Sequence, residues 1–317
     1  MATMNTMEVL DAIKQNIQRK ILGKDDVIDK ILICLICGGH ALIEDVPGLG
    51  KTTLISALAE STSCSFRRLQ FTPDVLPSDI TGFHMIGIHN GERTFHPGAV
   101  HSQIPLADEI NRTGPRTQSA LLQARQEGEI TVDSETFKLP EPFLVFATQN
   151  PIEMTGTYPL PEAQLDRFLF RISIGYPDAK HELSILDGNQ RRMQETRLRP
   201  ICSDRDVLTL QRTLDEVHCV GAVKSSIVGI ANATRRHPQI SLGLSPRRPI
   251  PPMRSAIGPS LLLGRGVATP AAAHPASSPV IAHRLVLAPG AYAEGRPAED
   301  IVQEILSKIP VPGASAS

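Results

Sequence analysis

Apolar residues recur at helical spacing near the start of the chain. In residues 7–20, Val9, Ile13 and Ile17 lie four positions apart, which is typical of an amphipathic helix. A second helical pattern runs through residues 31–37 and stops at Gly38 and Gly39. We therefore expect two helices ahead of the first strand.

Short apolar runs then alternate with helical patterns. The runs that predict buried strands are 41–44, 66–71, 104–108, 143–148 and 168–174, and residues 52–60 predict a helix after the first of them. Strands that alternate with helices imply a mainly parallel sheet with helices on both faces. The chain is therefore expected to adopt an α/β fold, an αβα sandwich that binds its ligand at the carboxyl ends of the strands.

Two segments break this alternation and predict β-hairpins. Residues 82–95 contain Asn90-Gly91, a strong type I′ turn signal, and residues 129–139 carry two alternating arms around Asp133-Ser134. From residue 178 the pattern becomes helical, over 178–186, 203–220 and 223–237. The 317 residues fit about two domains, and we expect the boundary near Pro177, giving domains 1–177 and 178–317.

Prolines crowd into the second of these domains. Eight lie between Pro246 and Pro279, and four would fall inside a helix that began near residue 247: Pro249, Pro251, Pro252 and Pro259. Each costs a helix about 3 kcal/mol or more. We therefore expect residues 247–280 to be irregular.

The overall composition excludes several classes of protein. Lys and Arg number 32 against 33 Asp and Glu, so the net charge of -1 gives no general attraction to nucleic acid or to an anionic membrane. Five scattered cysteines suit a reducing cytoplasm better than a disulfide framework. Residues 1–10 lack the pattern of a signal peptide, and the longest apolar stretch, 31–43, is too short for a bilayer, so we expect no membrane span.

Residues 45–52 (DVPGLGKT) fit a phosphate-binding loop in all but the first position, where Asp45 replaces the usual glycine. Gly48 and Gly50 would let backbone N–H groups face phosphate oxygens. Lys51 would supply positive charge and Thr52 a hydroxyl for Mg²⁺, and the following helix would add its dipole. The alternative is an ordinary tight turn before a helix.

Two further strands end in polar residues. Asp108 and Glu109 follow an apolar run, where the first could hold Mg²⁺ and the second could orient water for attack on a phosphate. Asn150 follows the run 143–148 and could bind the γ-phosphate or that water. The alternatives are a solvated strand end and an asparagine that serves the local turn. Pro105 is unexpected in such a strand because it cannot donate to a central sheet ladder.

These motifs have a familiar order. The segments VPGLGKT, LADEINR with TQSALLQARQEGEITVD, FLVFATQNP and YPLPEAQLDRFLFR resemble the MoxR family of AAA+ ATPases. The resemblance covers about residues 21–177, and it resumes near residue 235 and over 282–308. It implies an AAA+ core followed by a small helical lid.

The resemblance also implies roles for individual residues. The positions that would bind ATP are Gly23, Asp45, Val46, Pro47, Gly48, Leu49, Gly50, Lys51, Thr52 and Thr53. Those that would hold Mg²⁺ are Thr52 and Asp108, and those that would act in hydrolysis are Glu109, Asn150, Arg167 and Arg247.

Within this set, Asp108 and Glu109 would form the Walker B motif and Asn150 would be sensor 1. Arg167 would be an arginine finger that reaches a neighbouring subunit, and Arg247 would be sensor 2. The alternatives are that Arg167 forms a surface ion pair with Asp166 or Glu162 and that Arg247 is one of several solvated arginines. Residues 21–23 would lie beside the adenine, and the two hairpins would face the channel of a ring.

The function so implied is Mg²⁺-dependent ATP hydrolysis in a homo-oligomeric ring, expected to be a hexamer in the cytoplasm. Such a ring would remodel or mature a protein client in a chaperone-like way, commonly with a von Willebrand factor A domain partner. The alternative is a nucleotide-binding regulatory or assembly subunit with little hydrolysis, which Pro105 and the proline-rich segment favour. A nucleic-acid motor is a third candidate that the balanced charge disfavours.

Overall fold

The computed structural model describes residues 5–87, 91–151, 156–177, 183, 197–245, 250–262, 267–268 and 278–309. Its helices are α1 (Thr6–Gln18), α2 (Asp25–Cys37), α3 (Lys51–Ser61), α4 (Pro77–Thr81), α5 (Pro115–Glu127), α6 (Glu162–Leu165), α9 (Asp204–Glu216), α10 (Gly221–Arg236), α11 (Ile250–Leu262), α13 (Pro289–Ala293) and α14 (Ala298–Lys308), with 3₁₀ turns η1 (Ile110–Arg112) and η2 (Ala282–Arg284). Its strands are β1 (Ala41–Glu44), β2 (Phe66–Gln70), β3 (Gly82–Ile86), β4 (Arg93–Pro97), β5 (Ile104–Asp108), β6 (Glu129–Val132), β7 (Glu135–Lys138), β8 (Phe146–Gln149), β9 (Phe170–Ile172), β10 (His218–Cys219), β11 (Ile240–Leu242), β12 (Val267–Ala268) and β13 (Val286–Leu287). The helix predicted over 178–186 and the candidate Arg247 lie outside the described residues, residue 183 excepted.

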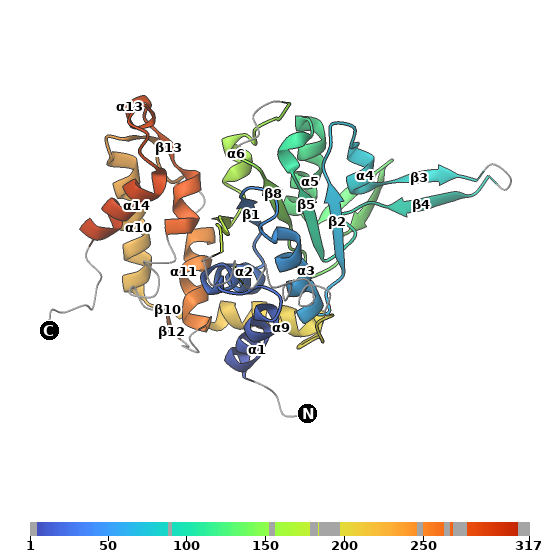
Figure 1. Ribbon diagram of the computed structural model, residues 1–317, viewed down its shortest axis with the longest axis horizontal. Helices are drawn as coiled ribbons and strands as arrows, with labels where there is room; N and C mark the ends of the chain where they lie inside the picture. The colour runs from blue at the N-terminus through green and yellow to red at the C-terminus, as the bar shows by residue number, and fades with distance from the viewer. Residues whose placement is uncertain are drawn as a thin grey trace.

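A five-stranded parallel sheet forms the centre of the molecule (Figure 1). The strand order is β2-β5-β8-β1-β9, so the strand before the phosphate loop lies between β8 and β9. Parallel strands need a long crossover between them, which the intervening helices provide. This architecture confirms the predicted α/β fold.

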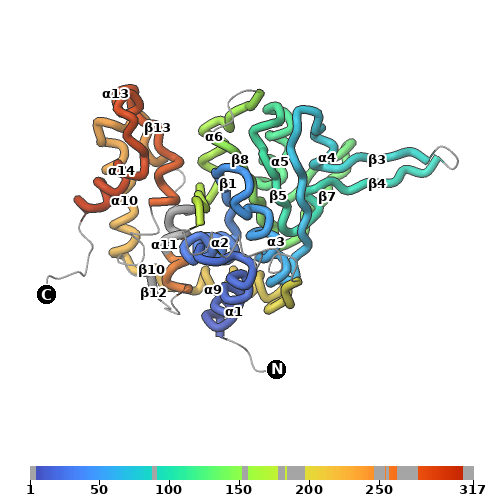
Figure 2. The backbone as a smooth tube through the Cα atoms, viewed as in Figure 1, coloured from blue at the N-terminus to red at the C-terminus, as the bar shows by residue number. Residues whose placement is uncertain are grey.

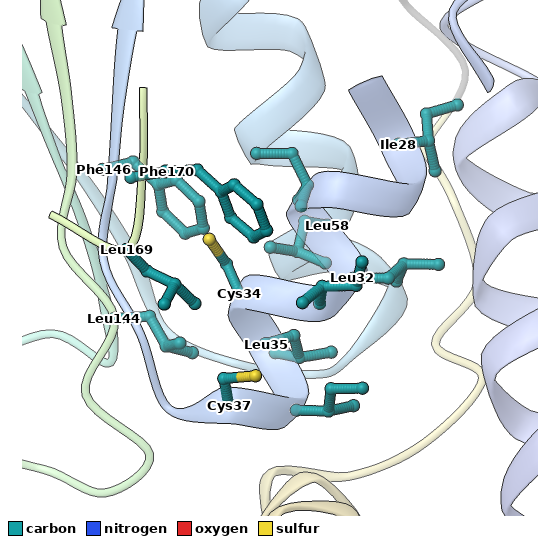
Figure 3. Packing of buried hydrophobic residues seen from close by; sticks show 14 of the residues in the cluster. Ile28, Leu32, Cys34, Leu35, Cys37, Leu58, Leu144, Phe146, Leu169 and Phe170 are labelled. Atoms are coloured by element: carbon teal, nitrogen blue, oxygen red, sulfur yellow. The ribbon is translucent and has the colours of Figure 1, made fainter. Parts of the chain in front are cut away.

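Successive residues of β1 serve opposite faces of the sheet. Ala41 and Ile43 join the hydrophobic cluster of α1, α2 and α3, while Leu42 joins the cluster of α5 on the other face. Figure 3 shows part of the first cluster, where Cys34 of α2 points toward Phe146 and Phe170. Cys34 is buried as a small apolar residue, and burial raises the pKa of its thiol well above the usual range.

One predicted strand differs from expectation in its burial. β2 was expected to be buried, yet Arg67, Arg68 and Gln70 are exposed because β2 lies at the edge of the sheet.

Pro105 is tolerated inside β5 because no ladder bond needs its missing N–H. Ile104 donates to the Ser65 carbonyl, so alternate residues of β5 bond to β2 and the backbone of Pro105 faces β8. The ladder between β5 and β8 begins only opposite Leu106.

The two predicted hairpins are present and contact each other. β3–β4 projects from the core in Figure 1, and β6–β7 turns at Asp133 and Ser134, both with positive φ. Phe95 and Phe137 stack between them with their ring centroids 4.1 Å apart. The hairpins therefore share a packed base.

The lid is a separate cluster of helices on one side of the core (Figure 2). α10 and α14 pack with the short strands β11 and β13 around Ile230, Ile301 and Ile305. The same chain returns to the core through α11, whose Ile257 and Leu261 belong to the cluster of α2.

The expectation that residues 247–280 are irregular was wrong for Ile250–Leu262, which form α11. Pro251 and Pro252 lie in its first turn, where a missing N–H removes no helical hydrogen bond. Pro259 lies inside the helix. Its cost is offset by tertiary packing, since Gly258 approaches Ile33 so closely that an added methyl group would lie 2.7 Å from that side chain.

Candidate nucleotide-binding site

The loop between β1 and α3 has the backbone of a phosphate-binding loop. Gly48 and Gly50 adopt φ of +88° and +81°, which residues with a Cβ rarely adopt. A methyl group added at Gly48 would meet nothing within 4 Å, so that part of the loop borders open space. Lys51 is the first residue of α3, and the unbonded N–H groups of that helix end are suited to an anion.

Lys51 lies at the centre of the site. Its Nζ donates to the carbonyl oxygen of Asp45 at 2.6 Å. Burial lowers the pKa of Lys51, while the nearby carboxylates of Asp108, Asp45 and Glu109 act in the opposite direction. The ammonium group is thus bonded to the loop within the field of three carboxylates.

Asp45 has a structural task in place of the usual glycine. Its Oδ2 accepts hydrogen bonds from the N–H groups of Ile174 and Gly175, the second at 2.8 Å, and from the Ser173 hydroxyl at 3.1 Å. The carboxylate therefore joins the phosphate loop to the chain that leaves β9.

Asp108 is held on both of its oxygens. Thr148 of β8 donates its hydroxyl to Oδ1 at 2.6 Å, and Arg68 of β2 donates to Oδ2 from Nε at 2.9 Å and from Nη2 at 2.6 Å. The Asp108 side chain is only 10% exposed. A cation at this position would have to share Oδ2 with Arg68 or displace it.

Glu109 has an unusual backbone and two side-chain donors. Its φ of +58° turns the chain sharply after β5, and its N–H donates to the Thr148 hydroxyl oxygen at 2.9 Å. Its Oε2 accepts from Gln70 Nε2 at 2.9 Å and lies 2.8 Å from Arg112 Nε. Such a conformation costs of order 1–3 kcal/mol, and the bonds around it hold the carboxylate beside Asp108.

Asn150 is buried at the end of β8, one position beyond Gln149, whose carbonyl accepts from the Asp45 N–H at 3.2 Å. The Asn150 carbonyl accepts from Asn111 Nδ2 at 3.4 Å. The strand order therefore brings Asn150, Lys51 and Asp108 to the carboxyl ends of neighbouring strands.

Residues 21–24 also reach the loop. A methyl group added at Gly50 would lie 3.6 Å from Ile21, and Lys24 donates to the Tyr176 carbonyl at 2.8 Å. Gly23 adopts φ of +68° between them. This places the expected adenine-binding segment beside the phosphate loop.

Arg167 lies on the short turn that follows α6. Its Nε is buried and has no hydrogen-bond partner within the described chain. Asp166 was one of the two partners that the sequence offered for a surface ion pair with Arg167. In the structure the Asp166 carboxylate pairs with Arg284, with its Oδ1 3.2 Å from Arg284 Nε.

Four residues that shape the site were not predicted from the sequence: Arg68, Gln70, Arg112 and Thr148. A signal for Thr148 was present, because it is the hydroxyl within the apolar run before Gln149. Arg68 and Gln70 lie two positions apart on one face of β2. Their partners Asp108 and Glu109 lie 40 and 39 positions away in the chain, so no local pattern pointed to these contacts.

Comparison with known proteins agrees with this geometry. The family model described as ATPase family associated with various cellular activities (AAA) matches residues 40–170, and that of the AAA lid domain matches 232–305. A crystal structure from Cytophaga hutchinsonii, described as a "putative ATPase", superposes with a TM-score of 0.90 at 34% identity over 96% of both chains. The protein therefore has the fold of an AAA+ ATPase with a helical lid.

Two relatives narrow the class. The chain is 36% identical to the chaperone MoxR1 of Mycobacterium tuberculosis over 95% of its own length and 81% of that protein. It is 45% identical to the protein YeaC of Bacillus subtilis over 94% of its own length and 93% of that protein. The chain belongs to the MoxR family of AAA+ ATPases.

Proposed function

We propose that this protein hydrolyses ATP with Mg²⁺ at the edge of the sheet where Lys51, Asp108 and Glu109 meet. The observation that carries the proposal is the bonded set around the Thr148 hydroxyl. It donates to Asp108 Oδ1 and accepts from the Glu109 N–H, so one atom fixes both acidic residues relative to the phosphate loop. Pre-arranged groups of this kind lower the barrier to phosphoryl transfer because they need not reorganise.

The loop residues would bind the triphosphate. The N–H groups that follow Gly48 and Gly50 would donate to phosphate oxygens, and Lys51 would exchange its bond to Asp45 for one to the β- and γ-phosphates. Val46, Pro47, Leu49 and Thr53 would line the same loop, with Gly23 beside the adenine. Asn150 would bind the γ-phosphate or the attacking water.

The donor set suits Mg²⁺. The Thr52 hydroxyl and the Asp108 carboxylate are hard oxygen ligands of the type that Mg²⁺ takes together with phosphates and water. When bound, the ion would neutralise charge on the phosphate oxygens. Glu109 would orient the water and accept its proton, with Gln70 and Arg112 fixing the direction of the carboxylate.

We further propose that the protein works as a homo-oligomeric ring, with a hexamer as the expected size, and that Arg167 acts on the nucleotide of the neighbouring subunit. The buried Nε of Arg167, which finds no acceptor in the described part of its own chain, supports this role. Arg247, the candidate sensor 2, would act from the lid. We place the boundary between core and lid near Pro177, shortly after the last parallel strand ends at Ile172.

The work of the ring would be chaperone-like. A relative is named chaperone MoxR1, and we propose that this protein likewise remodels or matures a protein client, together with a partner that carries a von Willebrand factor A domain. The cytoplasm is the proposed location because all five cysteines are free, which suits a reducing compartment.

The test is the rate of ATP hydrolysis against protein concentration with Mg²⁺. Specific activity should rise with concentration and fall about 10³-fold or more in Arg167→Ala. Arg212→Ala, on the exposed face of α9, serves as the matched control and should match the wild type. Activity that is independent of concentration and of Arg167 would contradict the ring with a finger in trans.

A second candidate is the nucleotide-binding assembly subunit with little hydrolysis. The observation that favours it is the pair of bonds from Arg68 to Asp108 Oδ2, which compete with a metal ion for that oxygen. Nucleotide binding without turnover at any concentration, together with turnover gained in Arg68→Ala, would select this candidate.

A further inference from the structure

Two residues of the lid, His283 and Arg284, form hydrogen bonds with the backbone on both sides of Arg167. We call Asp166–Phe168 the finger segment. Arg284 of η2 donates from Nε to the Asp166 carbonyl at 3.3 Å and from Nη2 to the Phe168 carbonyl at 2.7 Å. Its Nε also lies 3.2 Å from the Asp166 carboxylate. The neighbouring His283 donates from Nε2 to the same Phe168 carbonyl at 3.0 Å.

These contacts are enclosed. The Arg284 side chain is 4% exposed, and its Nη1 donates to the Val280 carbonyl at 2.7 Å, which ties the guanidinium to the chain just before η2. Hydrogen bonds from a buried, charged donor are about twice as strong as those between neutral groups. The planar guanidinium bonds to the carbonyls of the residues before and after Arg167. It therefore restricts the position and the orientation of the Arg167 backbone.

A cavity lies beside these polar contacts. A cavity of about 620 Å³ opens between α6 and the lid, and its lining includes Asp166, Arg284, Leu242 and Val286. η2 is the lid element next to α6, which lies on the side of the core that faces the lid (Figure 2). The polar contacts of Arg284 and His283 therefore join η2 to the chain that follows α6, beside this cavity.

We propose that Arg284 is a positioning residue for the arginine finger, so that the lid of one subunit fixes the arginine that serves its neighbour's ATP. This inference rests on the proposed action of Arg167 in trans. A guanidinium must meet the phosphoryl oxygens at hydrogen-bond distance, and a displacement of about 1 Å can cost about 10²-fold in rate. A lid that moves would carry the finger segment with it, and so link the state of one site to hydrolysis at the next.

The test uses Arg284→Lys, which keeps the buried charge but loses the fork that spans Asp166 and Phe168. We expect kcat to fall about 10- to 10²-fold with the KM for ATP nearly unchanged. Arg296→Lys is the matched control, because Arg296 pairs with Glu304 within the lid and should leave both constants unchanged. Asp166→Asn, which keeps the size of the side chain and removes the ion pair, should shift kcat in the same direction by less. It decides the matter if Arg284→Lys does not fold.

Mixed rings then show where Arg284 acts. In a mixture with Glu109→Gln, an Arg284→Lys site can receive an intact finger from its neighbour, so activity should return at roughly a quarter of the interfaces of an equimolar ring. Arg167→Ala mixed with Glu109→Gln is the benchmark. Recovery in the benchmark but not with Arg284→Lys, or an unchanged kcat in Arg284→Lys alone, would overturn this inference and leave the trans finger standing. No recovery in either mixture, or full activity of Arg167→Ala alone, would overturn the trans finger and the inference together.

Discussion

The phosphate loop and the finger segment are built in opposite ways. Lys51 bonds to Asp45, six positions away, and Glu109 pairs with Arg112, three positions away. The finger segment is held by bonds that join residues 115 to 118 positions apart. The first region combines such local bonds with ties inside the core, such as those from Arg68 and Thr148 to Asp108, each 40 positions away, whereas the second exists only once the lid has returned to the core. Chemistry in the first is therefore robust to changes in the lid, and positioning in the second is not.

The largest expected effect tests the first region. Glu109→Gln keeps the size and the Gln70 contact of the side chain but removes the base, so turnover should fall about 10²–10⁴-fold while ATP affinity stays. The measurement is kcat beside a direct binding titration with the same preparation.

Lys51→Ala is the companion variant. It should lose about 10- to 10²-fold in ATP affinity, since a charged hydrogen-bond donor is removed from the phosphate loop. If Glu109→Gln weakened binding as Lys51→Ala does, the separation of the two roles would be wrong.

The next effect tests how local the phosphate loop is. Asp45→Ala removes the acceptor for the N–H groups of Ile174 and Gly175, and should lower the free energy of unfolding by about 1–3 kcal/mol. Denaturant unfolding of the variant measures this loss. Asp45→Asn keeps one acceptor oxygen and should lose less. A variant as stable as the wild type would show that the loop needs no tie to the chain beyond β9.

The smallest effect concerns the finger segment. Burial, helped by the charge of Arg284, lowers the pKa of His283 to about 3. The unfolded chain would take up a proton near pH 6.5, which the folded chain resists, so stability is complete above that value and falls as the pH drops toward 3. Each pH unit in this window costs about 1.4 kcal/mol.

His283→Gln keeps a donor for the Phe168 carbonyl and cannot titrate. Its unfolding free energy should therefore depend less steeply on pH between about 6 and 4.5 than that of the wild type, by about 1.4 kcal/mol per unit. An unchanged slope would mean that His283 is accessible to protons in the folded protein, and the junction would be looser than described. His40 stays in both proteins, and since burial also lowers its pKa, its contribution cancels in the comparison.

Several elements could be predicted closely from the sequence, and some could not. The strand at residues 104–108 was predicted with its observed bounds, because a short apolar run that ends in acidic residues is typical of a buried strand that ends at the surface. The burial of β2 was misjudged, since apolar content does not say which strand lies at an edge. Helix α11 was not predicted, because its prolines disfavour a helix when only local propensity is considered. Ile257 and Leu261 are buried against α2, which is far away in the chain, and this packing stabilises the helix.

The alternation of apolar runs with helical patterns by itself predicted the α/β core. The phosphate loop and the acidic strand end were predictable because phosphate binding needs particular residue types at fixed local spacing. Only the tertiary structure decided which groups hold them. Thr148 meets Asp108 and Glu109 through the register of β8 beside β5, and Arg284 meets the finger segment through the return of the lid. The physical reason is that a hydrogen bond across a sheet or between domains depends on strand order and packing, which are set by burial over the whole chain and leave no spacing to read in the sequence.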